Sequence, residues 1–221
     1  MTFVNRLIRL NVIALALLSS CLTGAAQERK ITYGILLDNT GSMRSQFRQV
    51  IELGKAVVHQ VHGRGTVSLF DFHSQGQGSR IANPFLRVEA SADEQLLTRA
   101  LEGFYVEGGQ TALLDAIGLI AETLDRAESD EKVVILITDG EDRTQDDQKK
   151  LIKQLREHKI SVFAIGLIQQ LDDESGLIRL SPRARATDFL KSITRETGGR
   201  VVFPKSDRIQ VEKVLAELAL P

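Results

Sequence analysis

Short apolar runs alternate with amphipathic segments along this chain of 221 residues, from Ile31 onward. The runs are rich in Val, Ile and Leu and are short enough to be buried strands rather than helices. The strands that we expect are Ile31–Leu37, Thr66–Phe72, Val133–Thr138, Ile160–Leu167 and Arg200–Phe203.

The segments between these runs place apolar residues three or four positions apart, as on one face of a helix. The helices that we expect are Met43–Val61, Asp93–Glu102, Ala112–Ala127, Gln145–His158, Ala186–Glu196 and Asp207–Leu218. Strands that alternate with helices predict an α/β fold, in which a doubly wound and mainly parallel central sheet carries helices on both faces.

One apolar run departs from the parallel pattern. Asn83 and Pro84 precede the run Phe85–Val88. Because proline cannot donate a hydrogen bond to a neighbouring strand, we expect this run to be a short antiparallel edge strand. The Gln-, Gly- and Ser-rich segment Ser74–Ser79 would join it to the strand Thr66–Phe72 as a hairpin.

The N-terminal residues have the pattern of an export signal. Arg6 and Arg9 precede the uniformly apolar segment Val12–Leu18, and small residues follow. This apolar segment is much shorter than the ~20 residues that span a bilayer. We therefore expect the protein to be exported to the periplasm or the extracellular space.

Two cleavage sites remain open. Thr23–Ala26 is typical of an ordinary signal peptide and would remove residues 1–26. Leu18–Cys21 instead resembles the box of bacterial lipoproteins, which would remove residues 1–20 and leave Cys21 lipidated. The remainder, residues 30–221, has the length of a single domain. A lipid on Cys21 would be its only attachment to a membrane.

Composition excludes some functions. The chain has 28 Lys and Arg against 29 Asp and Glu, a formal charge of −1, and no Trp. Since it has neither a basic stripe nor interleaved aromatic residues, nucleic-acid binding is not expected. Its single Cys excludes a disulfide within the chain, and the spacing of its four His does not indicate a zinc site.

Side chains with oxygen atoms stand where predicted strands end. The first strand runs into Asp38, and Thr40 and Ser42 follow. Another strand runs into Asp139, and Thr111 lies after two glycines on a loop just before a helix. Because open α/β sheets bind ligands at the carboxyl ends of their strands, we expect these five residues to share one site. Hydroxyl and carboxylate oxygens suit Mg²⁺ or a similar cation better than zinc.

The order and spacing of these residues resemble the metal-ion-dependent adhesion site of the von Willebrand factor A (VWA) family. The first motif of that family is Asp-x-Ser-x-Ser, and a distant Thr and a distant Asp complete the site. In this chain the first motif is Asp38, Thr40 and Ser42, and the distant residues are Thr111 and Asp139. Thr40 departs from the usual Ser, but it keeps the hydroxyl group.

The resemblance implies a protein-binding module rather than an enzyme. In the family, hydroxyl groups bind a divalent cation directly, and carboxylates act partly through water. Most of the charge of the ion is then uncompensated, and a partner protein supplies an Asp or Glu carboxylate. For this chain the resemblance implies Mg²⁺ (or Mn²⁺ or Ca²⁺), with Thr40 and Ser42 as direct ligands.

Simpler roles remain open for the same residues. Thr40, Ser42 and Thr111 could cap the helices that follow them, and Asp38 and Asp139 could order their own loops. The site could also be degenerate, with weak metal binding. The protein would then be a structural VWA domain.

An enzyme alternative rests on the same first motif. Asp38–Ser42 resembles the Asp-Lys-Thr-Gly-Thr motif of P-type ATPases, in which the Asp is phosphorylated. Asp38 would then be the nucleophile of a Mg²⁺-dependent phosphotransferase-like enzyme. Asn39 in place of the lysine, and a Thr111 loop that has no role in such chemistry, argue against this alternative.

Two further segments border the expected site. Glu141 and Asp142 could tune the affinity for a metal or belong to a solvated loop. The segment Ile168–Arg185 is longer than a strand-to-helix turn requires. It could form a specificity lip for a partner or a mobile, solvated loop.

Overall fold

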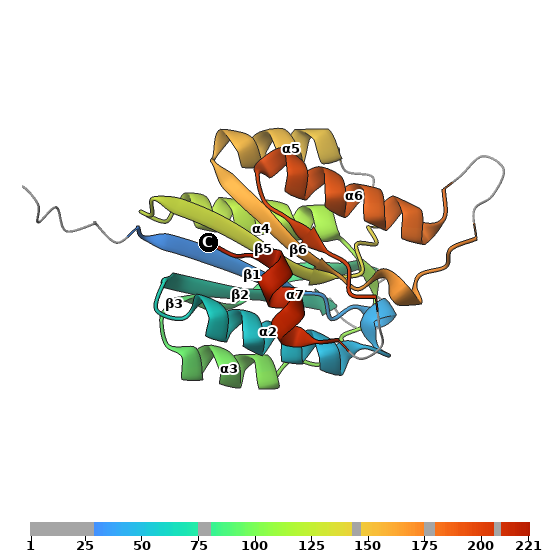
Figure 1. Ribbon diagram of the computed structural model, residues 1–221, viewed down its shortest axis with the longest axis horizontal. Coiled ribbons are helices and arrows are strands. Elements are labelled where there is room, and N and C mark those ends of the chain that lie inside the picture. Colours follow the sequence, from blue (N-terminus) through green and yellow to red (C-terminus); the bar gives the residue numbers. More distant parts are fainter. Residues whose placement is uncertain (1–28, 75–80, 143–146, 175–179, 206–208) are drawn as a thin grey trace, which may run out of the picture.

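A seven-stranded sheet forms the centre of the protein (Figure 1). The computed structural model describes residues 29–74, 81–142, 147–174, 180–205 and 209–221. The strands are β1 (Ile31–Leu37), β2 (Gly65–Ser74), β3 (Ile81–Ser91), β4 (Gln110–Thr111), β5 (Glu131–Thr138), β6 (Ile160–Gly166) and β7 (Val201–Val202). Their order in the sheet is β4-β3-β2-β1-β5-β6-β7, so β1 is central.

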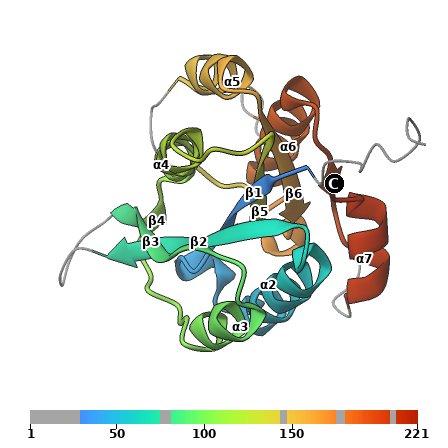
Figure 2. The same cartoon turned by 90° about the vertical axis from the view of Figure 1, so that its left-hand side faces the viewer.

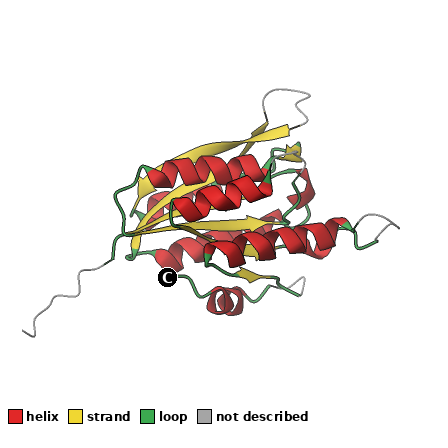
Figure 3. Ribbon diagram, turned by 90° about the horizontal axis from the view of Figure 1, so that it is seen from above, coloured by secondary structure: helices red, strands yellow, loops and turns green. Residues whose placement is uncertain are grey.

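Helices cover both faces of the sheet (Figure 2). They are α2 (Phe47–Val61), α3 (Glu94–Glu102), α4 (Leu113–Asp125), α5 (Gln148–Glu157), α6 (Pro182–Thr197) and α7 (Val211–Leu218), with short 3₁₀ helices η1 (Gly41–Met43) and η2 (Ile168–Gln170). Apolar residues of α2, α3 and α7 pack on one face, and those of α4, α5 and α6 pack on the other. Seen from above, most of these helices run roughly along the strands (Figure 3). The expected doubly wound fold is therefore confirmed.

The strand β1 shows why the central runs are apolar throughout. All seven of its residues are buried, because helices cover both faces of the sheet. Tyr33 and Ile35 face the core that α2, α3 and α7 form, whereas Leu36 faces the opposite core. At Gly34 the helix α4 comes so close that an added Cβ would clash with the Ile120 side chain.

The prediction of a short edge strand at Phe85–Val88 was wrong in two respects. The strand β3 is antiparallel to β2, as expected, but it has 11 residues, and β4 pairs with its first two, Ile81 and Ala82. Pro84 lies within β3, opposite Phe72. The pairing with β4 stops before Pro84. From Pro84 onward, β3 is therefore paired only with β2 in the described sheet, and proline is tolerated at such an edge.

Several helix boundaries also differ from the prediction. The helix expected from Met43 begins at Phe47, because Gly41–Met43 forms the 3₁₀ turn η1. The helix expected from Ala186 begins one turn earlier, at Pro182, where Ser181 Oγ accepts a hydrogen bond from the Ala184 amide at 3.1 Å. The fixed φ of proline suits the first helical position.

The predicted export signal, both cleavage sites and Cys21 lie outside the described residues, as does the predicted start of the last helix at Asp207. In the part of the chain that the structure describes, none of the helices combines the length and the apolar character that a membrane span requires.

Candidate metal centre

The five predicted site residues lie together at the carboxyl-terminal edge of the sheet. Asp38 follows β1, and its amide donates to the Ile137 carbonyl of β5 at 2.9 Å. Asp139 directly follows β5, so the parallel pairing of these two strands brings the two carboxylates to the same edge. The hydroxyl groups of Thr40, Ser42 and Thr111 complete the cluster, as the following distances show.

The first motif folds back on its own carboxylate. Thr40 Oγ1 donates to Asp38 Oδ1 at 2.6 Å, and the Thr40 amide donates to the same oxygen at 3.1 Å. Ser42 Oγ lies 3.4 Å from Thr40 Oγ1. Thr40 occupies the N-cap position of η1, but its side chain makes no capping hydrogen bond. Its hydroxyl therefore faces the cluster, and the simpler role of a helix cap does not apply to it.

Thr111 joins the cluster from a distant part of the chain. Its Oγ1 lies 3.0 Å from Thr40 Oγ1, although the two residues are 71 positions apart. Thr111 stands in the two-residue strand β4 rather than in a loop, and Ala112, not Thr111, takes the N-cap position of α4. A capping role is thereby excluded for Thr111 as well.

Asp139 contacts the cluster through Ser42. The Ser42 hydroxyl hydrogen-bonds the Asp139 side chain, and Asp139 Oδ1 also accepts from the Glu141 amide at 2.9 Å. Asp38, Thr40, Thr111 and Asp139 are each at most 3% exposed, whereas Ser42 is exposed. The cluster is therefore open to solvent on the side of Ser42.

Two carboxyl groups share this buried place, and the pKa of each is raised. Burial raises the pKa of Asp139 to about 7, and the neighbouring charge of Asp38 adds to the effect. Burial also raises the pKa of Asp38, although hydrogen bonds from Thr40 and Thr138 oppose the shift. The charge of Glu141 raises both values further. A cation between the two carboxylates would remove this repulsion.

The donor set decides which ion could bind. Across the described ranges, no three side chains of His, Cys, Asp or Glu come together in a way that could hold a metal. A metal at this cluster would therefore depend on the three hydroxyl groups in addition to the two carboxylates. A set made only of hard oxygen donors fits Mg²⁺, Mn²⁺ or Ca²⁺ and lacks the nitrogen and sulfur ligands that zinc favours.

Two buried residues that support the cluster were missed in the sequence. Thr138 Oγ1 donates to Asp38 Oδ2 at 2.7 Å and accepts from the Gly140 amide at 3.0 Å, so it orients Asp38 from β5. Its signal in the sequence was a hydroxyl at the last position of an apolar strand, directly before Asp139.

Asn39 is the second missed residue, and it ties together three segments. Its Oδ1 accepts from the Phe72 amide at 2.9 Å, and its Nδ2 donates to the Tyr105 carbonyl at 3.0 Å. Its own carbonyl accepts from the Glu107 amide at 3.0 Å. Asn39 therefore holds the segment that leads to Thr111 against the first motif.

An ion pair lies beside Asn39. Asn39 Nδ2 is 3.4 Å from the buried carboxylate of Asp71, and Arg87 Nε donates to both oxygens of that carboxylate at 2.8 Å. The guanidinium group of Arg87 lies 5.1 Å from the ring centre of Phe85 and 5.8 Å from that of Phe104. The strands β2 and β3 and the segment after α3 are thus connected next to the site.

Glu141 and Asp142 are not equivalent. Glu141 acts on the two site carboxyls through its charge. Asp142 points to the helix α4, where its Oδ1 accepts from the amides of Leu113 and Leu114. Asp142 therefore has a structural partner, and the interpretation of a solvated loop is wrong for this residue.

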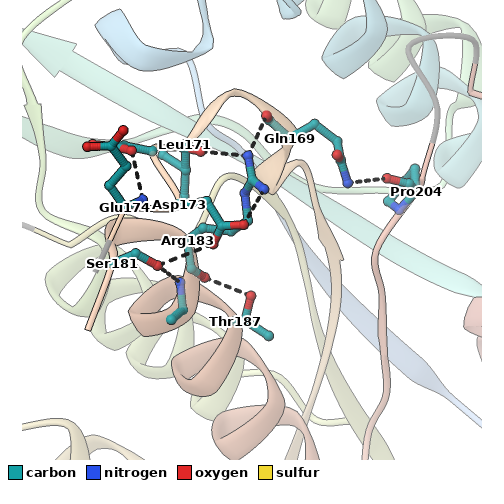
Figure 4. Close-up of polar contacts among 10 residues, drawn as sticks. Gln169, Leu171, Asp173, Glu174, Ser181, Arg183, Thr187 and Pro204 are labelled. Atoms are coloured by element: carbon teal, nitrogen blue, oxygen red, sulfur yellow. Dashed lines mark hydrogen bonds and ion pairs between the residues drawn. The ribbon is translucent and has the colours of Figure 1, made fainter. Parts of the chain in front are cut away.

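The long segment after β6 is fastened to the protein where the structure describes it (Figure 4). Arg183 Nη2 donates to the carbonyls of Leu171 and Gln169 at 2.8 and 3.1 Å, and Arg183 Nη1 pairs with Asp173 at 2.9 Å. Gln169 Nε2 donates to the Pro204 carbonyl at 3.2 Å. These contacts tie the described residues after β6 to Arg183 at the start of α6 and to Pro204.

The geometry also bears on the enzyme alternative. A phosphorylated Asp must present a carboxylate oxygen to its substrate. Asp38 is fully buried, Thr40 occupies one of its oxygens with two hydrogen bonds, and Thr138 occupies the other. This arrangement suits a carboxylate that is held in place better than one that attacks a phosphoryl group.

The match to a family model agrees with this geometry. The model of the von Willebrand factor type A domain matches residues 34–213. The chain belongs to this family. VWA domains are generally interaction modules rather than enzymes, and they commonly bind a divalent metal ion.

Solved structures share the VWA fold with this chain. An aerotolerance-related membrane protein from Bacteroides fragilis matches with a TM-score of 0.63 and 19% identity, over 85% of this chain and 98% of its own. The pilus adhesin SpaC from Lactobacillus rhamnosus matches with a TM-score of 0.61 and 16% identity, over 87% of this chain and 29% of its own. Manganese-loaded TRAP protein from Plasmodium vivax matches with a TM-score of 0.55 and 15% identity, over 75% of this chain and 63% of its own. At these identities the likeness establishes the fold.

Proposed function

We propose that this VWA domain binds another protein through a divalent cation held by Asp38, Thr40, Ser42, Thr111 and Asp139. The observation that carries the proposal is the convergence of three hydroxyl groups from two distant segments on a pair of buried carboxylates. Neither helix capping nor the nucleophile chemistry of a phosphotransferase accounts for this convergence.

The residues fit Mg²⁺, Mn²⁺ or Ca²⁺ in a simple division of roles. The hydroxyl oxygens of Thr40 and Ser42 contact the ion directly. Asp38 and Asp139 balance its charge, and Thr111 contributes its hydroxyl from the side of β4. When bound, the ion supplies an electrophilic position that attracts an anionic ligand. The manganese-loaded state of the TRAP structure supports this choice of ions.

The partner would offer an Asp or Glu carboxylate to the ion. Ser42 is the exposed member of the cluster, so the partner reaches the ion from that side. Tyr105 is 58% exposed, and its backbone carbonyl accepts a hydrogen bond from Asn39 beside the site. Exposed aromatic side chains of this kind are common at the centres of protein interfaces. The pilus adhesin among the similar structures is consistent with a role in attachment.

The location that we propose for this function is outside the cytoplasm. The export pattern of residues 1–26, or of residues 1–20 with a lipid on Cys21, supports it. The similar structure from Bacteroides fragilis is itself a membrane protein. Mass spectrometry of the N-terminus of the mature protein would distinguish the two forms.

A calorimetric titration with Mg²⁺ and Mn²⁺ tests the proposed metal site. The wild type should bind one ion with saturation, and Ser42→Ala, Asp38→Ala and Asp139→Ala should each lose most of this binding. Ser45→Ala is the matched control, because Ser45 is an exposed hydroxyl three positions beyond Ser42 and outside the cluster. A folded wild type that binds no ion would refute the proposal and leave a structural VWA domain.

The partner can then be sought with the metal as a switch. A protein retained on the immobilised wild type in Mg²⁺, and released by a chelator, should not be retained by the Ser42→Ala variant. If the protein stays bound in the presence of the chelator and is also retained by the Ser42→Ala variant, the metal does not take part in recognition.

A further inference from the structure

The first turn of α4 is capped by a side chain from another loop. Ala112 stands at the N-cap position, and its methyl group offers no acceptor. Asp142 Oδ1 instead accepts from the Leu113 amide at 2.8 Å and from the Leu114 amide at 3.3 Å. A carboxylate is favoured there because the first amides of a helix lack partners and carry its positive dipole end.

This cap joins the two segments that bring Thr111 and Asp139 to the proposed metal site. Thr111 lies two residues before Leu113, and Asp139 lies three residues before Asp142. These two hydrogen bonds therefore connect Asp142 to residues 29 and 28 positions earlier in the chain and fix the loop of Asp139 relative to the start of α4.

Gly140 makes the connection sterically feasible. Its φ of +77° turns the chain between Asp139 and Asp142. A Cβ at this position would lie 2.9 Å from Leu190 Cδ1 and 3.2 Å from Ala186 Cβ, both of α6. The loop therefore passes close over α6 and reaches α4, instead of turning out into solvent.

The strand that carries Thr111 has little pairing. The strand β4 contains two residues, and it pairs with β3 only at Ile81 and Ala82. Asn39 and Thr40 relate the segment of Thr111 to the first motif, whereas the cap of α4 relates it directly to the loop of Asp139. The start of α4 is the place that Asp142 holds.

We propose that Asp142 is a positioning residue of the metal site, which sets the separation between Thr111 and Asp139 through the N-terminus of α4. The inference rests on the proposed function, since it assigns a role in cation binding to a side chain that caps a helix. Asp142 does not bind the ion in this scheme.

A second capped helix in the same chain provides a matched control. Asp93 Oδ1 accepts from the Gln95 and Leu96 amides at 2.9 and 3.0 Å, so a carboxylate also binds two amides in the first turn of α3. The helix α3 packs on the opposite face of the sheet from α4. Loss of either cap should lower the stability of the full-length protein, but only loss of the Asp142 cap should affect the site.

The experiment compares Asp142→Ala, Asp142→Asn and Asp93→Ala. Calorimetry with Mg²⁺ gives the affinity, and hydrogen exchange of residues 110–116 without metal reports the position of the loop. Asp142→Ala should weaken Mg²⁺ binding by about tenfold or more and speed this exchange, as loss of outer-shell partners does at other metal sites. Asp93→Ala should change neither. Asp142→Asn keeps an acceptor oxygen and should remain within about threefold of the wild-type affinity, because Asn caps helices as well as Asp.

Three results would overturn the inference even where the wild type binds Mg²⁺. Asp142→Ala with wild-type affinity would show that the cap does not position the site. Equal losses in Asp142→Asn and Asp142→Ala would show that the charge of Asp142, not its hydrogen bonds, matters. Unchanged hydrogen exchange of residues 110–116 in Asp142→Ala would show that the cap does not hold the start of α4, whatever the Mg²⁺ affinity of the variant. A wild type that binds no Mg²⁺ would instead refute the proposed function, and this inference with it.

Discussion

The hydroxyl oxygens of Thr40 and Thr111 lie 3.0 Å apart, and each belongs to a buried residue. Thr40 follows the central strand, and Thr111 lies in β4, at one end of the sheet order. Two hydroxyl groups that come from distant parts of the chain and lie in direct contact can both bind the same ligand.

Replacement of Thr111 by valine tests the value of its hydroxyl. Valine has nearly the same shape, so the fold should be retained while one oxygen donor is lost. We expect Thr111→Val to weaken Mg²⁺ binding by about tenfold or more, equivalent to ~1.4 kcal/mol. Thr111→Ser restores the hydroxyl and should recover most of the affinity in the same calorimetric titration. Equal affinities for Thr111→Val and wild type would exclude Thr111 as a ligand.

The stability of the metal-free protein should fall as the pH rises. The pKa of Asp139 is about 7 in the folded protein and near 4 in an unfolded chain. The folded state therefore holds this proton over a range in which the unfolded state has lost it. The stability that results is fully present below about pH 4 and is lost as the pH rises through 7, by at most ~4 kcal/mol.

Denaturant unfolding at about pH 5 and about pH 8 measures this dependence. The variant Asp139→Asn cannot ionise and should show a smaller loss between the two conditions. Mg²⁺ should stabilise the wild type at the higher pH, where both carboxylates are charged, by RT ln(1 + [L]/Kd). A wild type and an Asp139→Asn variant with the same pH dependence would mean that Asp139 ionises normally.

Asn39→Ala should be among the most destabilising substitutions near the site. Asn39 is fully buried, and its loss would leave the Phe72 amide and the Tyr105 carbonyl without their side-chain partner. We expect a loss of about 2–4 kcal/mol in the free energy of unfolding, measured with denaturant. A loss below about 1 kcal/mol would show that water or another side chain replaces the amide.

Gly140→Ala and Gly63→Ala separate two costs of an added methyl group. Both glycines have nearly the same positive φ, +77° and +78°. A Cβ at Gly63 would meet no atom within 4 Å, whereas a Cβ at Gly140 would press on Leu190 and Ala186. Gly63→Ala should cost about 1 kcal/mol for its backbone alone, and Gly140→Ala should cost about 1–3 kcal/mol more. Equal midpoints of thermal unfolding would contradict this difference.

Much of the candidate site could be located from the sequence because of one topological property. In a parallel sheet the carboxyl ends of strands meet at one edge, so Asp38 and Asp139 could be placed together from the ends of two apolar runs. Thr111 could be added from the two glycines before it, the predicted helix after it and the resemblance to the VWA family. Its two-residue strand is too short to leave a pattern in the sequence.

The supporting residues could not be predicted for a different reason. Helix caps are usually recognised within three residues of the helix, but the cap of α4 comes from Asp142, 29 positions from Leu113. The partners of Asn39 likewise belong to β2 and to the segment after α3. Such contacts exist only once the sheet has formed, and local spacing does not record them. We predicted a short strand because proline cannot pair on both sides. Proline can still lie within a longer strand that is paired on one side at that position, as Pro84 does in β3.

The strand β1 crosses the sheet (Figure 1), and the proposed site follows its last residue, Leu37. Its seven residues span about 20 Å at ~3.3 Å per residue. A tether on the segment before Ile31 and a partner held beyond Leu37 would therefore pull on opposite ends of the same strand. β1 is hydrogen-bonded along its length to β2 and β5, so such a load would act in shear on both ladders at once. A protein that attaches one surface to another would then bear tension through the most enclosed element of its fold.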